Sequence, residues 1–536
     1  MEQPKVNEKT RRGGGSSSST GSTGSLEEQD EGIIDGTYLT DSSDSSATAN
    51  NKETRPYTPS TTFQATRIKF FCDMVHSHVE LPLICYKIIN TRQFQRLRNL
   101  KQLGLCYYVY PTACHNRFEH CIGTSYLAGT YCKILQTNQP ELNIDNQDLL
   151  CVYIAGLLHD LGHGPFSHTW EQFISTYDKN YSHEEMSIKM MDYLLESNDL
   201  WTLCKYQAGL TERDLVFIKE IILGHPISGD EFQGRPPNKH FLYQIVSNDI
   251  TKIDVDKFDY ILRDCTQLNV KTGFDFQRIF NNSRVFFVRP GLKGAAVEVA
   301  ESAQDSTVTI IAYRKKISST LQELFLGRFS LHQKAYQHKV VRIVEMMVVD
   351  GLKAAEPYFR VPSSTDPAKV LKLSTAHQDV SAFIKITDSV LEQIIEWGNG
   401  GASARKIFND IINRKLYKCI GYLSDQINED LLDDLKACEP ALLLCYTSIN
   451  YGRGDENPLN SALFYVKARP GRLFKHKFSG PNLESKCFFL LRPTYAYEEG
   501  ETTSTISEED EQKRMQLMEE KVELILQKHE VELELE

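Results

Sequence analysis

Apolar residues recur at helical spacing through most of the chain between residues 83 and 350. Leu149, Val152 and Leu157 share one face of a helix that we expect over about residues 146–158, ending before Gly162. The same periodicity predicts further helices over residues 83–103, 116–135, 253–264 and 321–350, and one that begins near Ser182. The chain is therefore expected to be mainly α-helical.

Two other segments favour strands. Residues 284–288 and 307–313 are β-branched and aromatic, and Pro290-Gly291 lies between them, which predicts a small β insertion. Residues 462–467 and 486–492 have the same character within an otherwise helical stretch. The fold class predicted is mainly α, with a helical core, a small β insertion and a mixed α/β C-terminal lobe.

The two ends of the chain differ from the middle. Residues 1–62 are rich in Gly, Ser and Thr and cannot bury enough apolar surface to offset chain entropy, so we expect a disordered tail. The predicted core covers residues 63–350 and begins with a strand or loop entering a helix. The predicted C-terminal lobe covers residues 351–497. Residues 498–536 are expected to form an acidic tail or a short helix.

Charge and composition narrow the class of protein. Residues 498–536 hold 14 acids and 4 bases, so they contribute −10 of the net charge of −11 and leave the remainder near neutral. No apolar run approaches membrane-spanning length, and no signal peptide is visible. The thirteen cysteines form no regular framework, which is typical of reduced thiols. A basic cluster at residues 9–12 hints at nuclear import, so the nucleus, the cytoplasm or both are expected.

The strongest candidate chemistry lies at the end of the expected helix over residues 146–158. His159 and Asp160 are followed by His163 and His168, a set that suits zinc, iron or manganese. A histidine-rich helix cap without metal is the alternative for His159-Asp160 alone. The further histidines and the partners described next favour a metal site.

Three other helical faces carry polar side chains. Arg117 and His120 are three residues apart, and residues 256–264 place two carboxylates, an ammonium and a phenol on one face. An ion-pair ladder is the alternative for residues 256–264. Arg328, His332 and Tyr336 follow at four-residue steps, a stripe suited to a polyphosphate and a base ring. A basic face over residues 92–101 fits a solvated surface and a phosphate or nucleic-acid site equally well.

Five motifs carry a resemblance to a known family. They are Gln93-Phe-Gln-Arg-Leu-Arg98, His115-Asn-Arg-Phe-Glu-His120, His159-Asp-Leu-Gly-His-Gly-Pro-Phe-Ser-His168, Asp254-Val-Asp-Lys-Phe-Asp-Tyr260 and Ala335-Tyr-Gln-His-Lys339. The chain resembles the sterile-alpha-motif and HD-domain dNTP triphosphohydrolases over roughly residues 66–495. It looks like a member that lacks the sterile-alpha-motif domain, because residues 1–62 are too polar.

The resemblance implies a function and a set of site residues. The family cleaves a dNTP into a deoxynucleoside and triphosphate at a divalent metal, zinc, iron or manganese, with magnesium accompanying the nucleotide. Expected metal ligands are His120, His159, Asp160 and Asp256, and expected catalytic residues are His183, His168, His163 and Arg117. Expected substrate contacts are Gln102, Leu103, Arg117, His163, His168, Lys257, Tyr260, Asp264, Arg328, Tyr336 and Gln337, with Asp264 and Gln102 near the 3′-hydroxyl.

The resemblance also implies regulation by a GTP, dGTP or dNTP effector that drives assembly of a homo-oligomer, expected to be a tetramer. Expected effector residues are Lys69, Phe70, Asn90, Gln95, Arg98, Val109, Arg278, Arg314, Lys316, Lys339, Arg414, Lys418 and Lys467. The chain departs from the family pattern in this region: Asn90 replaces an Asp that reads guanine, Phe70 and Cys72 replace Val and Asn, and Asn282 and Thr320 replace Phe and Asn. Guanine selectivity of the effector site is therefore in question.

Three function classes stay in view from the sequence. The first is the dNTP triphosphohydrolase. The second is an HD-type phosphodiesterase or nuclease acting on cyclic nucleotides or single-stranded nucleic acid, which would not require the cations at Lys257 and Arg328. The third is a nucleic-acid-binding protein with a degenerate site, which the complete set of expected metal ligands argues against.

Overall fold

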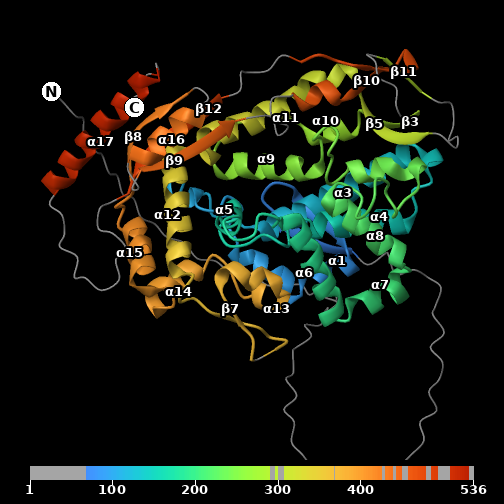
Figure 1. The fold of residues 1–536 in the computed structure, drawn as a ribbon. Coiled ribbons are helices and arrows are strands. Elements are labelled where there is room, and N and C mark those ends of the chain that lie inside the picture. The colour runs from blue at the N-terminus through green and yellow to red at the C-terminus, as the bar shows by residue number, and fades with distance from the viewer. Residues whose placement is uncertain are drawn as a thin grey trace, which may run out of the picture. The chain divides into compact units, whose positions relative to one another are not determined.

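Helices dominate the computed structural model, as the hydrophobic periodicity predicts (Figure 1). The structure describes residues 68–289, 296–299, 307–366, 368–424, 429–438, 442–449, 457–478, 484–492, 508–529 and 531, all of which belong to one compact unit, Pro59–Glu536. The expected tail at residues 1–62 and the Pro290-Gly291 turn lie outside the described residues. The predicted fold class is confirmed.

Four helices form the centre of the core: α3 (Arg117–Asn138), α4 (Asn146–Leu158), α8 (Glu212–Leu223) and α9 (Val255–Gln267). α4 packs between α3 and α8, and α9 packs on α3. Gly123 permits the last contact, because a Cβ there would overlap the Asp259 carboxylate of α9. The remaining core helices are α1 (Leu83–Ile89), α2 (Arg92–Gln95), α5 (His168–Ile174), α6 (His183–Ser197), α7 (Leu200–Ala208) and α10 (Phe276–Phe280), with 3-10 turns η1 (Arg96–Asn99), η2 (Cys106–Tyr108), η3 (Pro140–Leu142) and η4 (Pro237–Gln244).

The entry to the core is a hairpin. β1 (Ile68–Asp73) pairs antiparallel with β2 (Ser77–Pro82), from Ile68 opposite Pro82 to Asp73 opposite Ser77. The prediction of one helix over residues 83–103 was wrong, because α1 ends at Asn90 and α2 starts anew. Thr91 has extended backbone angles, and its side chain accepts a hydrogen bond from Phe94 N at 3.3 Å, so it caps a new helix.

The predicted helix over residues 321–350 is also interrupted. α11 (Ser318–Leu331) passes into a π-helical turn, η6 (His332–Tyr336), and α12 (Lys339–Ala355) begins after Gln337. His338 has extended backbone angles, and its Nδ1 accepts a hydrogen bond from Val340 N, so it caps α12. The prediction of a continuous helix was therefore wrong. A π-helical turn changes the direction of the side chains that follow it, and such turns are frequent at functional sites.

The predicted β insertion is present but is part of a larger sheet. β3 (Ser283–Val288) and β5 (Val308–Arg314) pair antiparallel, and β10 (Leu463–Val466) adds to β5 in parallel. β11 (Arg469–Lys475) and β4 (Ala296–Glu298) complete the order β3-β5-β10-β11-β4. This sheet joins strands from both sides of the boundary expected at residue 350, which itself remains a prediction.

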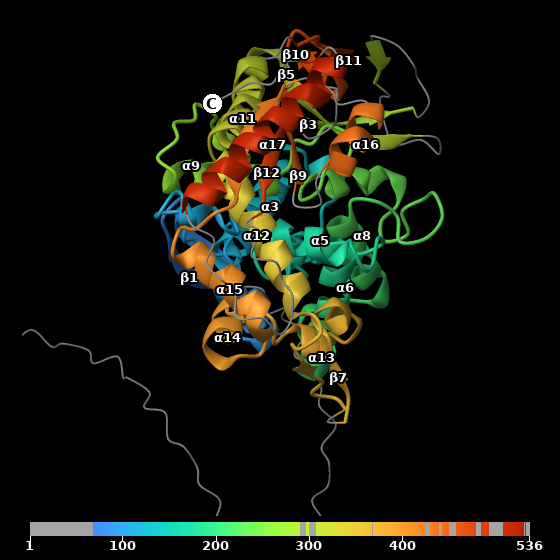
Figure 2. The ribbon, with the colours of Figure 1, turned by 60° about the vertical axis from the view of Figure 1, so that its left-hand side comes forward.

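The C-terminal lobe mixes helices with a second sheet. α12 packs on α15 (Gly401–Ile412) and α5, and β8 (Lys418–Leu423), β12 (Glu484–Leu491) and β9 (Leu442–Ile449) form an antiparallel sheet. α17 (Glu508–Lys528) packs through Met518, Val522 and Leu526 on α16 (Glu429–Cys438) and this sheet. Figure 2 shows the ribbon of α17 crossing in front of β12. The other elements are η5 (Lys315–Ile317), β6 (Val361–Pro362), β7 (Val370–Leu371), η7 (Leu373–Gln378), α13 (Val380–Phe383), α14 (Val390–Trp397) and η8 (Pro458–Ser461).

The described helices and cysteines bear on two expectations from composition. No helix in the described part of the chain is long and apolar enough to cross a membrane. The twelve cysteines whose side chains are described are free of disulfides.

Candidate active site

A cavity of about 610 Å³ lies between the core helices and the start of α12. Its volume is within the range of small-molecule sites. Every residue that the resemblance places around the substrate lines it: Gln102, Leu103, Arg117, His163, His168, Lys257, Tyr260, Asp264, Arg328, Tyr336 and Gln337. His120, Asp160, Asp256 and His183 also reach its wall, whereas His159 lies behind them beside a smaller cavity. The fold thus brings together residues from four of the five sequence motifs, whereas residues 93–98 do not line the cavity.

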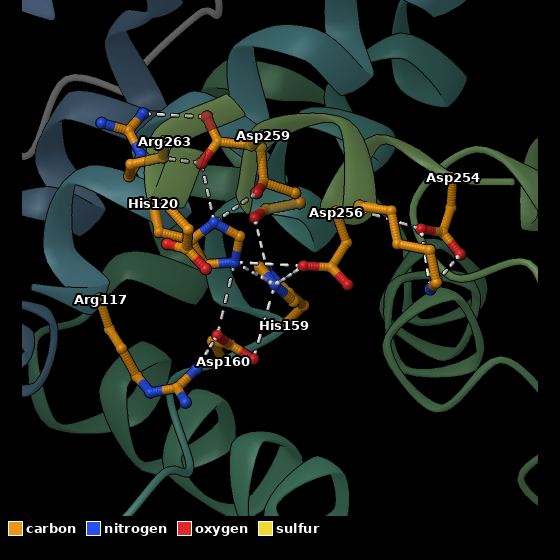
Figure 3. A network of polar contacts seen from close by, with 12 residues as sticks. Arg117, His120, His159, Asp160, Asp254, Asp256, Asp259 and Arg263 are labelled. Carbon is orange, nitrogen blue, oxygen red and sulfur yellow. Dashed lines mark hydrogen bonds and ion pairs between the residues drawn. The ribbon is translucent and has the colours of Figure 1, made fainter. Parts of the chain in front are cut away.

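Two histidines and two aspartates converge at one end of this cavity (Figure 3). The Nε2 atoms of His120 and His159 are 3.2 Å apart, and Asp256 Oδ1 lies 3.2 and 3.3 Å from them. Each carboxylate oxygen of Asp160 lies 3.5 Å from one of the two imidazoles. Lone pairs and carboxylates that face one another this closely repel unless a cation lies between them. Nitrogen and oxygen donors of this type fit zinc, iron or manganese.

Hydrogen bonds behind the cluster fix which nitrogen each histidine presents. His120 Nδ1 donates to Asp259 Oδ2 at 2.8 Å, and His159 Nδ1 donates to the Gly156 carbonyl at 2.9 Å. These bonds occupy the Nδ1–H groups and leave each Nε2 lone pair to the cluster. Asp259 is held in turn by Arg263 through two bonds of 2.9 Å, and by His76 at 2.7 Å. The donor set is therefore oriented in advance.

Local sequence places these groups on their elements. α3 begins with a capping box, in which Glu119 accepts a hydrogen bond from Asn116 N at 2.8 Å, so Arg117 and His120 occupy its first turn. α4 ends at His159, where the chain leaves the helix toward Gly162. A Cβ on Gly162 would overlap the backbone of α6, which brings His183 close. Asp256 occupies the first turn of α9.

Arg117 joins the metal cluster to the cavity wall. Its guanidinium forms an ion pair with Asp160, and its Nε donates to Ser167 Oγ at 2.9 Å. Burial raises the pKa of Asp160, but Arg117 and the neighbouring histidines outweigh it and hold the pKa well below its usual range. Asp160 therefore stays ionised, as a metal ligand must be.

Three histidines and Glu171 form a second cluster beside the metal groups. The rings of His163 and His183 stack with centroids 3.9 Å apart, and His183 Nδ1 lies 2.7 Å from Glu171 Oε1. Burial and Arg117 lower the pKa of His163 well below its usual value. Burial also lowers the pKa of His183, but Glu171 raises it by more. His168, 3.6 Å from Glu171, is largely exposed. The two stacked rings therefore differ in proton affinity, since the pKa of His163 is lowered and that of His183 is raised.

Polar groups that suit a sugar and a base lie on the opposite wall. Asp264 accepts a hydrogen bond from Tyr336 and lies 2.7 Å from His115 Nε2. The side-chain oxygens of Gln102 and Gln337 are buried, and neither has a hydrogen-bond partner among the described residues. An unpaired buried acceptor is costly, so these two oxygens are suited to accept from a bound hydroxyl or base. Lys257 pairs with Asp254 at 3.2 Å and, with Arg328, supplies positive charge to the same cavity.

Comparison with known proteins agrees with this geometry. The HD domain family matches residues 117–263, from the start of α3 to α9. The chain is 40% identical over 440 residues to deoxynucleoside triphosphate triphosphohydrolase SAMHD1 of Danio rerio, covering 76% of this chain and 68% of that protein. It is 37% identical over 436 residues to the Homo sapiens protein of the same name, covering 76% and 67%. The chain belongs to the SAMHD1 family. The Dictyostelium discoideum homologue is 35% identical over 413 residues, covering 74% and 71%.

Membership of the SAMHD1 family confirms the resemblance seen in the motifs and makes the chain a hydrolase of the HD class. The HD match also supports a divalent metal at the His/Asp cluster, without indicating which metal. The individual roles of the site residues rest on the geometry above.

The expected effector residues lie outside the cavity, in three groups. The first group lies along the hairpin and from α1 to η1, and holds Lys69, Phe70, Asn90, Gln95 and Arg98. The second lies around one end of the five-stranded sheet, and holds Arg278, Arg314, Lys316 and Lys467. The third lies near η2 and β8, and holds Val109, Lys339, Arg414 and Lys418. Arg98 donates to Gln95 Oε1 at 2.8 Å. Asn282, a departure from the family pattern, bonds both Arg278 O and Arg314 Nη1. The three groups lie on different elements of the chain.

Several residues of the site were missed in the sequence. Glu171 lies three residues after His168, a helical spacing that was readable as a pair. Asp259 and Arg263 are four residues apart, which is also a helical spacing that indicates a pair. Their link to His120, however, depends on the packing of α9 on α3. Nothing local marks Ser167 or His76.

Proposed function

We propose that this protein hydrolyses dNTPs to deoxynucleosides and inorganic triphosphate. One observation carries the proposal: three members of the His/Asp cluster, a set of cations and several hydrogen-bond acceptors line the same cavity. The SAMHD1 relatives are named for this reaction. A substrate with an anionic tail at one end and a hydroxylated ring at the other matches this division of the cavity.

The cations of the cavity approach the triphosphate from different elements. Arg117 holds Asp160 and lines the phosphate end, whereas Lys257 and Arg328 approach from α9 and α11. When a divalent metal is bound by His120, His159, Asp160 and Asp256, it supplies positive charge and Lewis acidity at that end. The fixed cations stabilise the charge that develops on the α-phosphoryl group and its oxygens.

The histidine cluster supplies the proton that the leaving group requires. Cleavage between the α-phosphorus and O5′ leaves an alkoxide that needs a proton, and His183 is the group in the cavity best suited to give one. Glu171 raises the pKa of His183, which favours the protonated form, and also orients its ring. His168, with its exposed ring, can restore the proton from solvent.

The sugar end selects the deoxy form. Asp264, held by both Tyr336 and His115, is placed to accept a hydrogen bond from the 3′-hydroxyl, with Gln102 as a second acceptor. The Tyr336 ring against this carboxylate leaves little room for a 2′-hydroxyl. Ribonucleotides are therefore expected to be poor substrates.

Regulation is the second part of the proposal. The basic groups at Lys69–Arg98 and at the sheet end would bind a GTP, dGTP or dNTP effector, with magnesium, between subunits of a homo-oligomer, expected to be a tetramer. Like-charged patches approach one another favourably only with an anion between them, so effector binding and assembly are thermodynamically linked. With Asn90 in place of a carboxylate, we expect activation by several nucleotides or activity without GTP.

Product analysis tests the proposal. Purified protein with added manganese is incubated separately with dGTP, GTP and single-stranded DNA, and the products are resolved by ion-exchange chromatography. We expect deoxyguanosine and triphosphate from dGTP, little from GTP and no shortening of the DNA. Release of nucleotides from DNA without dGTP cleavage would instead assign the cavity to a nuclease. The Asp264→Ala variant, matched by Asp192→Ala on the surface of α6, should narrow the difference between dGTP and GTP.

A further inference from the structure

Two loops meet at the border between the sugar end and the phosphate end of the cavity. One, the Gln102 loop, carries Gln102 and Leu103. The other, the His168 loop, carries Phe166 and Ser167 and leads into His168, the first residue of α5. Their backbones are in direct contact at Gly104, where φ is +50° and a Cβ would lie 2.6 Å from the Phe166 carbonyl oxygen. The relative position of these loops sets the distance between the groups that hold the sugar and those that hold the phosphates.

The second loop is held in an unfavourable conformation. Phe166 and Ser167 have φ of +56° and +57°, a region that residues with a side chain rarely adopt. Such conformations persist only where surrounding contacts enforce them, and they concentrate at functional sites. Ser167 Oγ supplies one such contact, since it donates to Lys101 O at 2.7 Å while accepting from Arg117.

Asp388 supplies the other contact from far away in the chain. It lies between α13 and α14, and its own N–H donates to Asn99 O at 3.2 Å. One carboxylate oxygen accepts from Phe166 N at 2.7 Å, and the other accepts from Lys101 N at 2.8 Å. The Asp388 side chain therefore accepts a hydrogen bond from the backbone of each loop, one at each carboxylate oxygen.

We propose that Asp388 is a positioning residue. By hydrogen bonding to both the Gln102 loop and the His168 loop, it fixes the distance between the groups that bind the sugar of the substrate and those that bind its phosphates. The identity of the substrate in this inference rests on the proposed function, whereas the link between the loops does not. Asp388 itself belongs neither to the cavity lining nor to the metal cluster. It acts through the two backbones that it joins.

A carboxylate is required for this arrangement. Two N–H groups point at the side chain, and only Asp offers an acceptor to each, because an amide would turn its NH₂ toward one of them. Keeping the charge there is costly: burial raises the pKa of Asp388 to about 6, against the opposing effects of the two N–H groups, Lys101 and Arg96. Arg96, whose Nε donates to Ile386 O at 3.1 Å, lies buried nearby.

The first test follows the loops themselves by hydrogen–deuterium exchange. In Asp388→Asn we expect faster exchange in peptides that cover residues 99–104 and 164–168, and unchanged exchange elsewhere in the core. Asp379→Asn is the matched control, since that carboxylate caps α13 through Ser381 and contacts neither loop. Unchanged exchange in both peptides would overturn the proposal regardless of the substrate.

The second test measures sugar discrimination, taken as kcat/KM for dGTP divided by kcat/KM for GTP. We expect Asp388→Asn to lower kcat/KM for dGTP by about 10- to 100-fold and to reduce this ratio. A loss of folded protein would lower kcat/KM equally for dGTP and GTP and leave their ratio unchanged. A constant ratio therefore contradicts the positioning role. If Asp388→Asn fails to fold, Ser167→Ala cuts the other bridge between the loops and must reduce the same ratio.

Discussion

The His/Asp cluster and the residues expected to bind an effector are arranged in opposite ways. At the metal cluster, each imidazole already has its outer nitrogen occupied, by Asp259 or by the Gly156 carbonyl, and all four expected ligands converge within one chain. The effector residues, by contrast, fall in three groups on different elements, and none lines the substrate cavity. One region is a single cluster of side chains, and the other is spread over several elements.

Under the proposed regulation, this difference indicates where an effector would act. A chain that already holds its metal donors in place needs no effector to build the cluster, so we expect metal binding to be independent of oligomeric state. An effector would instead influence the elements that border the cavity, such as α12, which carries Lys339 and packs on α5. Four experiments test this contrast.

The largest effect is expected from Asp160→Ala. The variant removes a ligand and leaves the Arg117 guanidinium without its partner, so activity should fall by more than about 1000-fold as several kcal/mol of charge stabilisation are lost. Metal content, measured by elemental analysis, should fall as well. Asp192→Ala, which removes only a surface pair with Lys219, is the control. Full metal content and full activity in Asp160→Ala would refute the ligand assignment.

Asp259→Asn should have a smaller effect on the same region. It keeps the shape of the side chain but weakens the bond that orients His120, so metal affinity should fall by about 10- to 100-fold. Activity should return at high metal concentration, which Asp160→Ala cannot show. An activity loss that no metal concentration restores would place Asp259 in the chemistry itself.

Glu171→Gln tests the proton donor through pH. Glu171 raises the pKa of His183 against the effect of burial, so the acid form of His183 persists to higher pH than it would without that carboxylate. Removing that charge lowers the pKa, and the alkaline fall in kcat should move to lower pH. The measurement is kcat against pH for wild type and variant. An identical alkaline limb would exclude His183 as the acid that controls the rate.

The smallest effect is expected from Asn90→Asp in the effector groups. A carboxylate accepts hydrogen bonds more strongly than an amide, so GTP should bind about tenfold more tightly and activate more selectively over ATP. Asn90 is exposed at the C-terminal end of α1, where an added negative charge opposes the helix dipole and costs about 0.3–1 kcal/mol of stability. Initial rates and sedimentation with GTP, ATP or neither provide the readout. Strict GTP dependence that is the same in wild type and variant would show that position 90 does not govern effector choice.

Helical phase explains what the sequence predicted well. Arg117 and His120 lie in the first turn of α3, and Asp256, Tyr260 and Asp264 share a face of α9, so spacing alone placed them correctly relative to one another. The fold class followed from the same periodicity. Each of these inferences depends on contacts within one element.

The features that the sequence did not predict depend on contacts between elements or on interruptions within a helix. Thr91 and the π-helical turn at His332–Tyr336 interrupt segments whose apolar spacing continues through the break, so periodicity could not reveal either. Asp388 meets Phe166 across more than two hundred residues, and no spacing rule links them. Sequence thus revealed the reacting groups more readily than the residues that hold them.

The most direct test of the proposed reaction is hydrolysis of dGTP in water labelled with oxygen-18, followed by phosphorus NMR and mass spectrometry of the products. If water attacks the α-phosphorus at the metal cluster and His183 protonates O5′, the label should appear in triphosphate, one atom per molecule, and none in deoxyguanosine. Label in deoxyguanosine, or products of diphosphate and monophosphate, would contradict the assignment of the cavity.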